Sequence, residues 1–145
     1  MKTHKYIIIL LTVFICFIAG GCNSKKATVH YKRQWMLVSF KDYTKEFLIE
    51  KKAALNLSKI ENESSPEFGT AFMGCNNIRL KAKFSDDDKV AFSDLISTKM
   101  FCPGNLESDF STVIAKINRY KIEGHFLYLY TEKDEQMKFI AADWD

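Results

Sequence analysis

The chain has 145 residues, of which 47% are hydrophobic and 14% aromatic, with 6 glycines and 2 prolines. This composition excludes collagen-like, low-complexity and wholly disordered chains, because it supplies enough apolar surface for one folded domain. The 21 basic and 18 acidic side chains nearly balance, which argues against a generic nucleic-acid binder, and the 3 histidines argue against a histidine-rich metal enzyme.

The first 21 residues have the pattern of a bacterial secretion signal. Lys2 and Lys5 precede Ile7–Ile18, an apolar run shorter than the roughly 20 residues that a membrane-spanning helix needs. The segment ends in Ala19-Gly20-Gly21-Cys22, which resembles the lipobox of bacterial lipoproteins. That resemblance implies cleavage before Cys22 and attachment of diacylglycerol and a further fatty acid, such as palmitate, to this cysteine. Ordinary signal cleavage with secretion and an uncleaved anchor are the alternatives.

Cysteine parity also favours lipidation. Once residues 1–21 are removed, Cys22, Cys75 and Cys102 remain, and an odd thiol is a liability in an oxidising compartment. Residues 22–32 then form the lipidated N-terminus and a polar tether, which holds a domain of residues 33–145 within roughly 17 Å of a membrane. Because Asn23 rather than aspartate follows the cysteine, we expect a periplasm-facing, outer-membrane location in a Gram-negative cell. The lipid bilayer is therefore one expected partner, and nucleic acid is not.

From Arg33 onward apolar side chains recur at every second residue, which predicts short antiparallel strands. The segment Ile78–Phe84 shows the strictest alternation, between apolar and basic residues. The other predicted strands are Gln34–Phe40, Ala54–Ile60, Phe68–Gly74, Val90–Ser93, Tyr120–Ile122, Phe126–Thr131 and Gln136–Ala142. We expect a mainly β (α+β) fold, a small barrel or strongly curled antiparallel sheet with one amphipathic helix, because unpaired sheet edges invite aggregation.

The one expected helix lies within Asn105–Tyr120. Its apolar stripe at helical spacing consists of Leu106, Phe110, Val113, Ile114, Ile117 and Tyr120. Pro103 and Gly104 precede the helix as a start signal, and Glu107 suits the positive end of the helix dipole.

The segment Phe126–Tyr130 is apolar at every position. A strand with only one face in the core does not need such a sequence. We therefore expect the aromatic row of Phe126, Tyr128 and Tyr130 to be buried in the core, with exposure to a partner as the alternative.

Two motifs in a fixed order carry a family resemblance. The matching residues are Trp35-Met36-Leu37, Gly69, Gly74-Cys75-Asn76, Thr98-Lys99-Met100-Phe101-Cys102, Glu107, Phe110, Tyr120–Gly124 and Leu127–Leu129. Over roughly Arg33–Ala142 the chain resembles the META domain family, which includes HslJ-like heat-shock lipoproteins of the bacterial envelope. The resemblance implies a compact, mainly antiparallel β-domain with one helix, no established catalytic centre and a role in envelope stress.

Cys75 and Cys102 are the best-defined candidate site residues. In an oxidising compartment they favour a disulfide, and closing the loop between them is worth roughly 3–4 kcal/mol of chain entropy. A zinc site with His30 and His125, a catalytic thiol paired with His125, and two reduced thiols are the alternatives. We expect no metal or other cofactor.

Three further groups of residues have two interpretations each. Asn76 is expected to serve a tight backbone turn, with a binding role as the alternative. The basic row of Arg79, Lys81 and Lys83 is expected to be solvated, with anionic lipid head groups or an acidic partner as the alternative. Asp86-Asp87-Asp88 is expected to form a solvated hairpin tip rather than a calcium site.

The chain carries no Gly-x-Ser-x-Gly, His-Glu-x-x-His, glycine-rich phosphate loop or Cys-x-x-Cys motif. We therefore predict a non-enzymatic, membrane-anchored envelope lipoprotein that supports envelope integrity or stress tolerance through contacts with another envelope protein. The alternatives are a periplasmic inhibitor of a hydrolase, such as lysozyme or a protease, and a carrier of a small apolar ligand.

Overall fold

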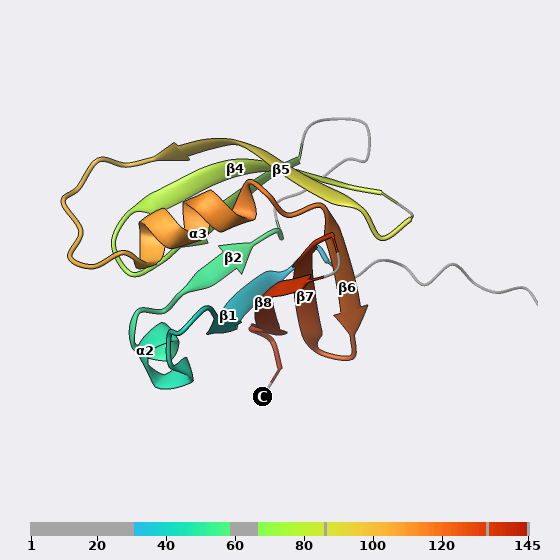
Figure 1. Cartoon of the computed structure of the whole chain (residues 1–145), viewed down its shortest axis with the longest axis horizontal. Helices are drawn as coiled ribbons and strands as arrows, with labels where there is room; N and C mark the ends of the chain where they lie inside the picture. Colours follow the sequence, from blue (N-terminus) through green and yellow to red (C-terminus); the bar gives the residue numbers. More distant parts are fainter. Residues whose placement is uncertain (1–30, 59–66, 86, 133, 145) are drawn as a thin grey trace, which may run out of the picture.

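The computed structural model describes residues 31–58, 67–85, 87–132 and 134–144. Eight antiparallel strands form one sheet in the order β5-β4-β3-β2-β1-β8-β7-β6 (Figure 1). The strands are β1 (Gln34–Phe40), β2 (Ala54–Asn56), β3 (Glu67–Phe72), β4 (Asn77–Phe84), β5 (Val90–Ser97), β6 (Arg119–Glu123), β7 (Phe126–Thr131) and β8 (Asp134–Ala141). The predicted mainly β fold is confirmed, while Cys22 and the signal segment lie outside the described residues.

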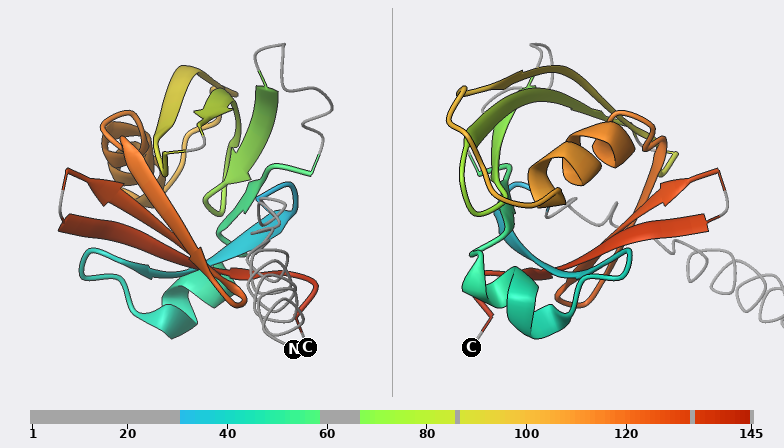
Figure 2. Two further views of the ribbon diagram at one scale, coloured as in Figure 1. Left: turned by 90° about the vertical axis from the view of Figure 1, so that its right-hand side faces the viewer. Right: turned by 60° about the vertical axis from the view of Figure 1, so that its left-hand side comes forward.

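The sheet curls until its two edge strands meet at one end. The amide of Val90 donates to the carbonyl of Asn118 over 3.1 Å, and the amide of Tyr120 donates to the carbonyl of Asp88 over 2.9 Å. Beyond this point β5 and β6 diverge, and the helix α3 (Leu106–Ile114) covers the opening between them (Figure 2). The protein is therefore a half-closed barrel whose open side is covered by a helix.

The core fills the inside of this barrel because each strand alternates between its two faces. In β4, Ile78, Leu80 and Ala82 point inward and are at most 1% exposed, while the basic residues between them point outward. Trp35 is fully buried, and its indole N–H donates to the carbonyl of Tyr31 over 2.9 Å. The predicted strands Gln34–Phe40 and Phe126–Thr131 coincide with β1 and β7, and in both the buried residues alternate with more exposed ones.

The expected helix within Asn105–Tyr120 is shorter than its apolar stripe indicates. The helix α3 ends at Ile114, and Arg119 already begins β6. Ile117 and Tyr120 are buried, as the stripe predicts, but they reach the core from a turn and from a strand. Backbone pairing with β5 and β7 decides this boundary, because Asn118 bonds to both strands through its main chain.

The structure has a second helix, α2 (Lys45–Glu50), which the sequence does not predict. The Thr44 side chain caps it by accepting a hydrogen bond from the amide of Phe47. Leu48 is its buried residue, and a helix of 6 residues is too short to display a helical period in the sequence. Neither helix of the described residues is long and apolar enough to cross a bilayer.

The prediction that Phe126, Tyr128 and Tyr130 are buried in the core is wrong. Leu127 and Leu129 are the fully buried residues of β7, and the three aromatic side chains lie half-buried on the outer face. The ammonium group of Lys138 lies 4.3 Å from the centroid of the Phe126 ring and partly covers it. The outward apolar face of β7 therefore packs against the Lys138 side chain on the outer surface of the sheet.

Asp109 in the first turn of α3 fixes the helix to the corner between β1 and α2. Its carboxylate accepts a hydrogen bond from the Tyr43 hydroxyl over 2.7 Å and pairs with the Lys41 ammonium over 2.5 Å. These two bonds, the one from Lys41 first, hold the pKa of Asp109 below its ordinary value. Burial of the phenol, followed by its bond to Asp109, raises the pKa of Tyr43 to about 12.

We expect Asp109→Asn to lower the melting temperature by a few degrees at neutral pH, while Asp42→Asn, at an exposed neighbour of Lys41, leaves it unchanged. Because the pKa of Asp109 is lowered in the folded state, its contribution is complete above the ordinary value of 3.8 and is lost as the pH falls through the lowered pKa. The two melting curves should therefore converge in acid. A gap between wild type and variant that persists at all pH values would contradict this electrostatic role.

Candidate functional site

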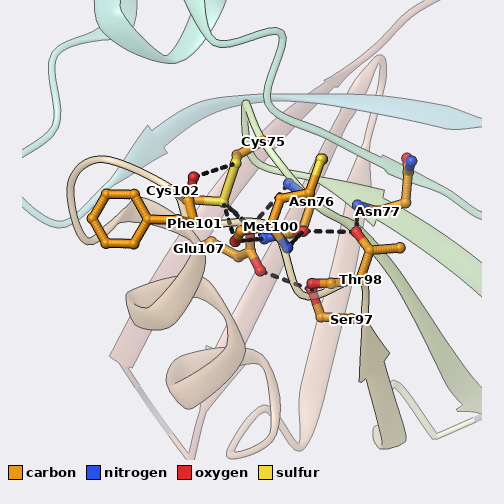
Figure 3. Close-up of a disulfide and its surroundings, with 9 residues drawn as sticks. All are labelled: Cys75, Asn76, Asn77, Ser97, Thr98, Met100, Phe101, Cys102 and Glu107. Carbon is orange, nitrogen blue, oxygen red and sulfur yellow. Dashed lines mark hydrogen bonds between the residues drawn. A yellow bond between two sulfur atoms is a disulfide. The ribbon is translucent and has the colours of Figure 1, made fainter.

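The two sequence motifs meet at one end of the barrel (Figure 3). Cys75 and Asn76 lie in the turn between β3 and β4, and Cys102 lies in the loop that leads from β5 to α3. Cys75 and Cys102 are joined by a disulfide with their Cα atoms 5.8 Å apart. The predicted disulfide is therefore confirmed, and it links the start of β4 to the loop ahead of the helix.

The Asn76 side chain organises this loop from within. It is only 4% exposed, and its amide oxygen accepts hydrogen bonds from the Thr98 hydroxyl over 2.7 Å and from the Met100 amide over 2.9 Å. Its amide nitrogen donates to the Met100 carbonyl over 3.1 Å and contacts Cys102 Sγ over 2.7 Å. The partners of this side chain thus lie in the distant loop of residues 98–102 and not in its own turn, and a binding role of Asn76 stays a prediction.

Glu107 completes the same network from the first turn of α3. Its carboxylate accepts from the amide of Asn76 over 3.1 Å and from the hydroxyl of Ser97 over 2.8 Å. From the sequence, Glu107 is expected at the positive end of the helix dipole and in the family pattern, but its contacts with distant segments are not predicted. The signal that could have found them is its place in the family pattern, shortly after the second motif cysteine.

The alternative chemistries for the two cysteines do not fit this arrangement. The ligand atoms of Cys75, Cys102 and Glu107 lie within 4.8 Å of one another, but zinc binds thiolates and both sulfurs are used in the disulfide. For the same reason neither sulfur is a free nucleophile for a base to activate. His125 lies in the turn after β6, where its ring stacks on that of Trp144. His30 lies outside the described residues.

Gly74 is required for the conformation of this turn. Its φ angle is +94°, and a Cβ atom at this position would lie 2.9 Å from the side chain of Lys51, which follows α2. A larger residue would be strained by its backbone and would also displace Lys51. The turn that carries Cys75 therefore packs closely against the end of α2.

The braced loop presents apolar side chains to solvent. Phe101 is 95% exposed and Met100 is 58% exposed, and Figure 3 shows the Phe101 ring pointing away from the disulfide. Ile96 near the end of β5 is 66% exposed. Met100 and Phe101 belong to the second motif, and their exposure is not predictable from the sequence, because a Met-Phe pair has the composition of a core segment until the backbone is known.

The basic row lies beside this loop on the outer face of β4. The Arg79 guanidinium lies 4.0 Å from the centroid of the Phe68 ring, and Lys81 pairs with Asp94 over 2.5 Å. Arg79 is also directly opposite Ile96 in the pairing of β4 with β5. Arg79, Lys81 and Lys83 thus share the outward face, as the alternation predicted, and their binding role stays a prediction.

A depression at the end of α3 and the acidic turn before β5 are two further places where a ligand could bind. The depression is lined by Val113, Lys116, Asn118, Thr131, Glu132, Asp134 and Gln136. Most of these side chains are polar, so the depression does not suit an apolar ligand. In the turn before β5, Asp87 pairs with Lys89, which fits a solvated tip, while Asp86 lies outside the described residues.

Comparisons with known proteins agree with this geometry. A family model described as META domain matches residues 27–144. The fold is similar to an NMR structure of a protein from Burkholderia xenovorans, with 17% identity, a TM-score of 0.57, and coverage of 77% of this chain and 83% of that chain. A second NMR structure has 14% identity, a TM-score of 0.51, and coverage of 77% and 91%. At these identities the structures show the fold alone, and no curated protein matches the chain.

We expect Asn76→Ala to destabilise the protein by about 2–4 kcal/mol, because it leaves the amide and carbonyl of Met100 without their partner. Asn77→Ala is the matched control. Asn77 is exposed and bonds to Thr98 only through its main chain, so its replacement should cost less than about 0.5 kcal/mol. Urea unfolding of both variants measures the difference, and equal midpoints would contradict the bracing role of Asn76.

Proposed function

The chain belongs to the META domain family, and from this membership we propose that it is a lipid-anchored, non-enzymatic protein of the bacterial envelope. The sequence Ala19-Gly20-Gly21-Cys22 after an apolar run supports the anchor, and the disulfide supports an oxidising compartment. A periplasm-facing position on the outer membrane is the corresponding location in a Gram-negative cell.

The proposal that the protein is non-enzymatic rests on how the polar groups at the motif site are bonded. Asn76, Glu107 and both cysteines are the residues that chemistry would require, and all four bond to one another or to the loop backbone. A catalytic site needs a group that is free to meet a substrate. The network instead holds a loop in place, which suits a protein that acts by contact.

Contacts with another envelope protein are the proposed means of supporting envelope integrity and stress tolerance. Register places Phe126 opposite Ile140, and Ile140 opposite Met36, on the outward face of β7, β8 and β1. Met36 is 42% exposed. This apolar row is the surface that we assign to protein contacts, because it offers area that burial would stabilise.

Inhibition of a hydrolase is the second candidate function, and the exposed Phe101 on a disulfide-braced loop favours it. A rigid loop loses little conformational entropy when it enters an enzyme cleft. If the full chain slows lysozyme or a protease, and Phe101→Ala abolishes that effect, inhibition replaces the leading proposal. The carrier alternative has no such support, because the described core residues fill the inside of the barrel.

Intact-mass analysis of the protein extracted from membranes tests the anchor. We expect loss of residues 1–21 and the added mass of a diacylglycerol and a further acyl chain on Cys22. The variant Cys22→Ser should lose this mass and leave the membrane fraction after mild extraction, whereas Cys16→Ser, in the removed segment, should behave as wild type. A wild-type chain that keeps residues 1–21 and leaves the membrane with the soluble proteins would overturn the proposal.

A further inference from the structure

Two features at opposite ends of β4 are not used by the proposed protein contacts. At the start of the strand, the loop tip of Met100 and Phe101 projects into solvent beside Ile96. At its other end, Lys83 precedes Phe84, on whose ring Tyr31 stacks with the centroids 3.9 Å apart. Tyr31 is the first described residue, so the N-terminal segment joins the domain at the Lys83 end of the basic row.

Few residues separate this end of β4 from the proposed anchor. Residues 23–30 are all that lie along the chain between Cys22 and the stacked Tyr31. The tether itself carries Lys25 and Lys26. A lipid on Cys22 would therefore hold the basic row near the head groups of the bilayer.

The length of β4 sets the distance between the two features. Its 8 residues extend over roughly 26 Å, with the tether at one end and the apolar loop tip at the other. Arg79, Lys81 and Lys83 lie between them on the outward face, and Lys99 adds a cation beside the tip. The outward face of β4 thus carries three cations, of which Lys81 also pairs with Asp94, between the end where Tyr31 stacks and the end where the loop tip is exposed.

This combination suits the surface of an anionic bilayer. Lysine and arginine are attracted to negative head groups, and exposed aromatic and aliphatic side chains enter the boundary between head groups and acyl chains. We propose that the basic row of β4 and the Met100–Phe101 tip dock on an anionic bilayer, so that the lipid on Cys22 and the ring of Phe101 hold the domain at two points. This inference rests on the proposed lipid anchor and names the surface that the anchored domain presents to its membrane.

The same geometry keeps the protein-contact row away from the lipid. In the sheet order, β1 is four strands from β5, so the outward face of Met36 lies on the other side of the barrel from Ile96. A domain that lies on the bilayer along β4 leaves Met36, Phe126 and Ile140 free for a partner. The loop tip and this row therefore have different roles.

The test uses the full chain, extracted with its anchor and reconstituted into vesicles of phosphatidylethanolamine and phosphatidylglycerol with brominated acyl chains. Phe101→Trp places a fluorophore at the proposed contact, and Met36→Trp places one at the matched exposed position. Both are compared with wild type, which supplies the emission of Trp35 and Trp144. We expect the added emission of Phe101→Trp to be quenched several-fold more than that of Met36→Trp.

A charge variant separates docking from simple proximity. Replacement of Arg79, Lys81 and Lys83 by glutamine in the Phe101→Trp chain should restore most of the emission, as should vesicles of phosphatidylcholine alone with the same brominated acyl chains. The melting temperature should stay close to that of the parent, because Lys83 is exposed and the surface contacts of Arg79 with Phe68 and of Lys81 with Asp94 each add little to stability. Equal melting temperatures would assign the loss of quenching to the missing charges.

The outcomes distinguish the inference from the function on which it rests. Acylated Phe101→Trp chains whose quenching equals that of Met36→Trp would overturn the docking face and leave the anchor intact. Phe101-dependent inhibition of a hydrolase without quenching by lipid would also overturn it and would assign the tip to a protein. A chain without acyl mass on Cys22 would overturn the proposed anchor itself, whatever the quenching shows.

Discussion

The side chain of Asn76 and the Cys75–Cys102 disulfide connect segments that strand pairing alone leaves apart. Eight strands can hydrogen-bond to their neighbours, but β5 and β6 diverge after one short contact, and the loop to α3 has no strand partner of its own. Asn76 supplies the missing partners for the loop backbone, and Glu107 extends the network into the helix. The disulfide and the hydrogen bonds of Asn76 and Glu107 hold α3 in place, and α3 covers the open side of the barrel.

The same network explains why the motif residues are not a reaction centre. Thiol, amide and carboxylate groups lie within bonding distance of one another, which in a free and reduced form would resemble a metal or nucleophile site. Here the sulfurs are joined and the polar atoms of Asn76 are satisfied within the protein. The motif specifies a loop, and its Met100 and Phe101 side chains face outward.

The outer surface divides into two sides with different chemistry. Cations and exposed apolar side chains gather along β4, β5 and the braced loop, while half-buried apolar residues cross β7, β8 and β1. This division follows from the curled sheet, because strands four places apart point to opposite sides of a barrel. Tyr31, the first described residue, stacks on Phe84 beside Lys83, so the chain enters the domain on the side that carries the cations.

Local pattern was sufficient to locate the strands, the disulfide pair and the outward basic row, but not every strand boundary. The structure ends β2 at Asn56, where Ala54–Ile60 was predicted, and extends β5 to Ser97, where Val90–Ser93 was predicted. Alternation in Ile78–Phe84 determines which side chains face the core whatever the neighbours are, and the pairing of Cys75 with Cys102 followed from the expectation of an oxidising compartment. Tertiary structure alone decided where α3 ends, which face of β7 is buried and what Glu107 binds. Each of these depends on backbone groups far away in the sequence, such as the pairing of Asn118 with Val90 and with Tyr130. A periodic pattern records how a segment divides between inside and outside, but it cannot say which distant strand will compete for its main chain.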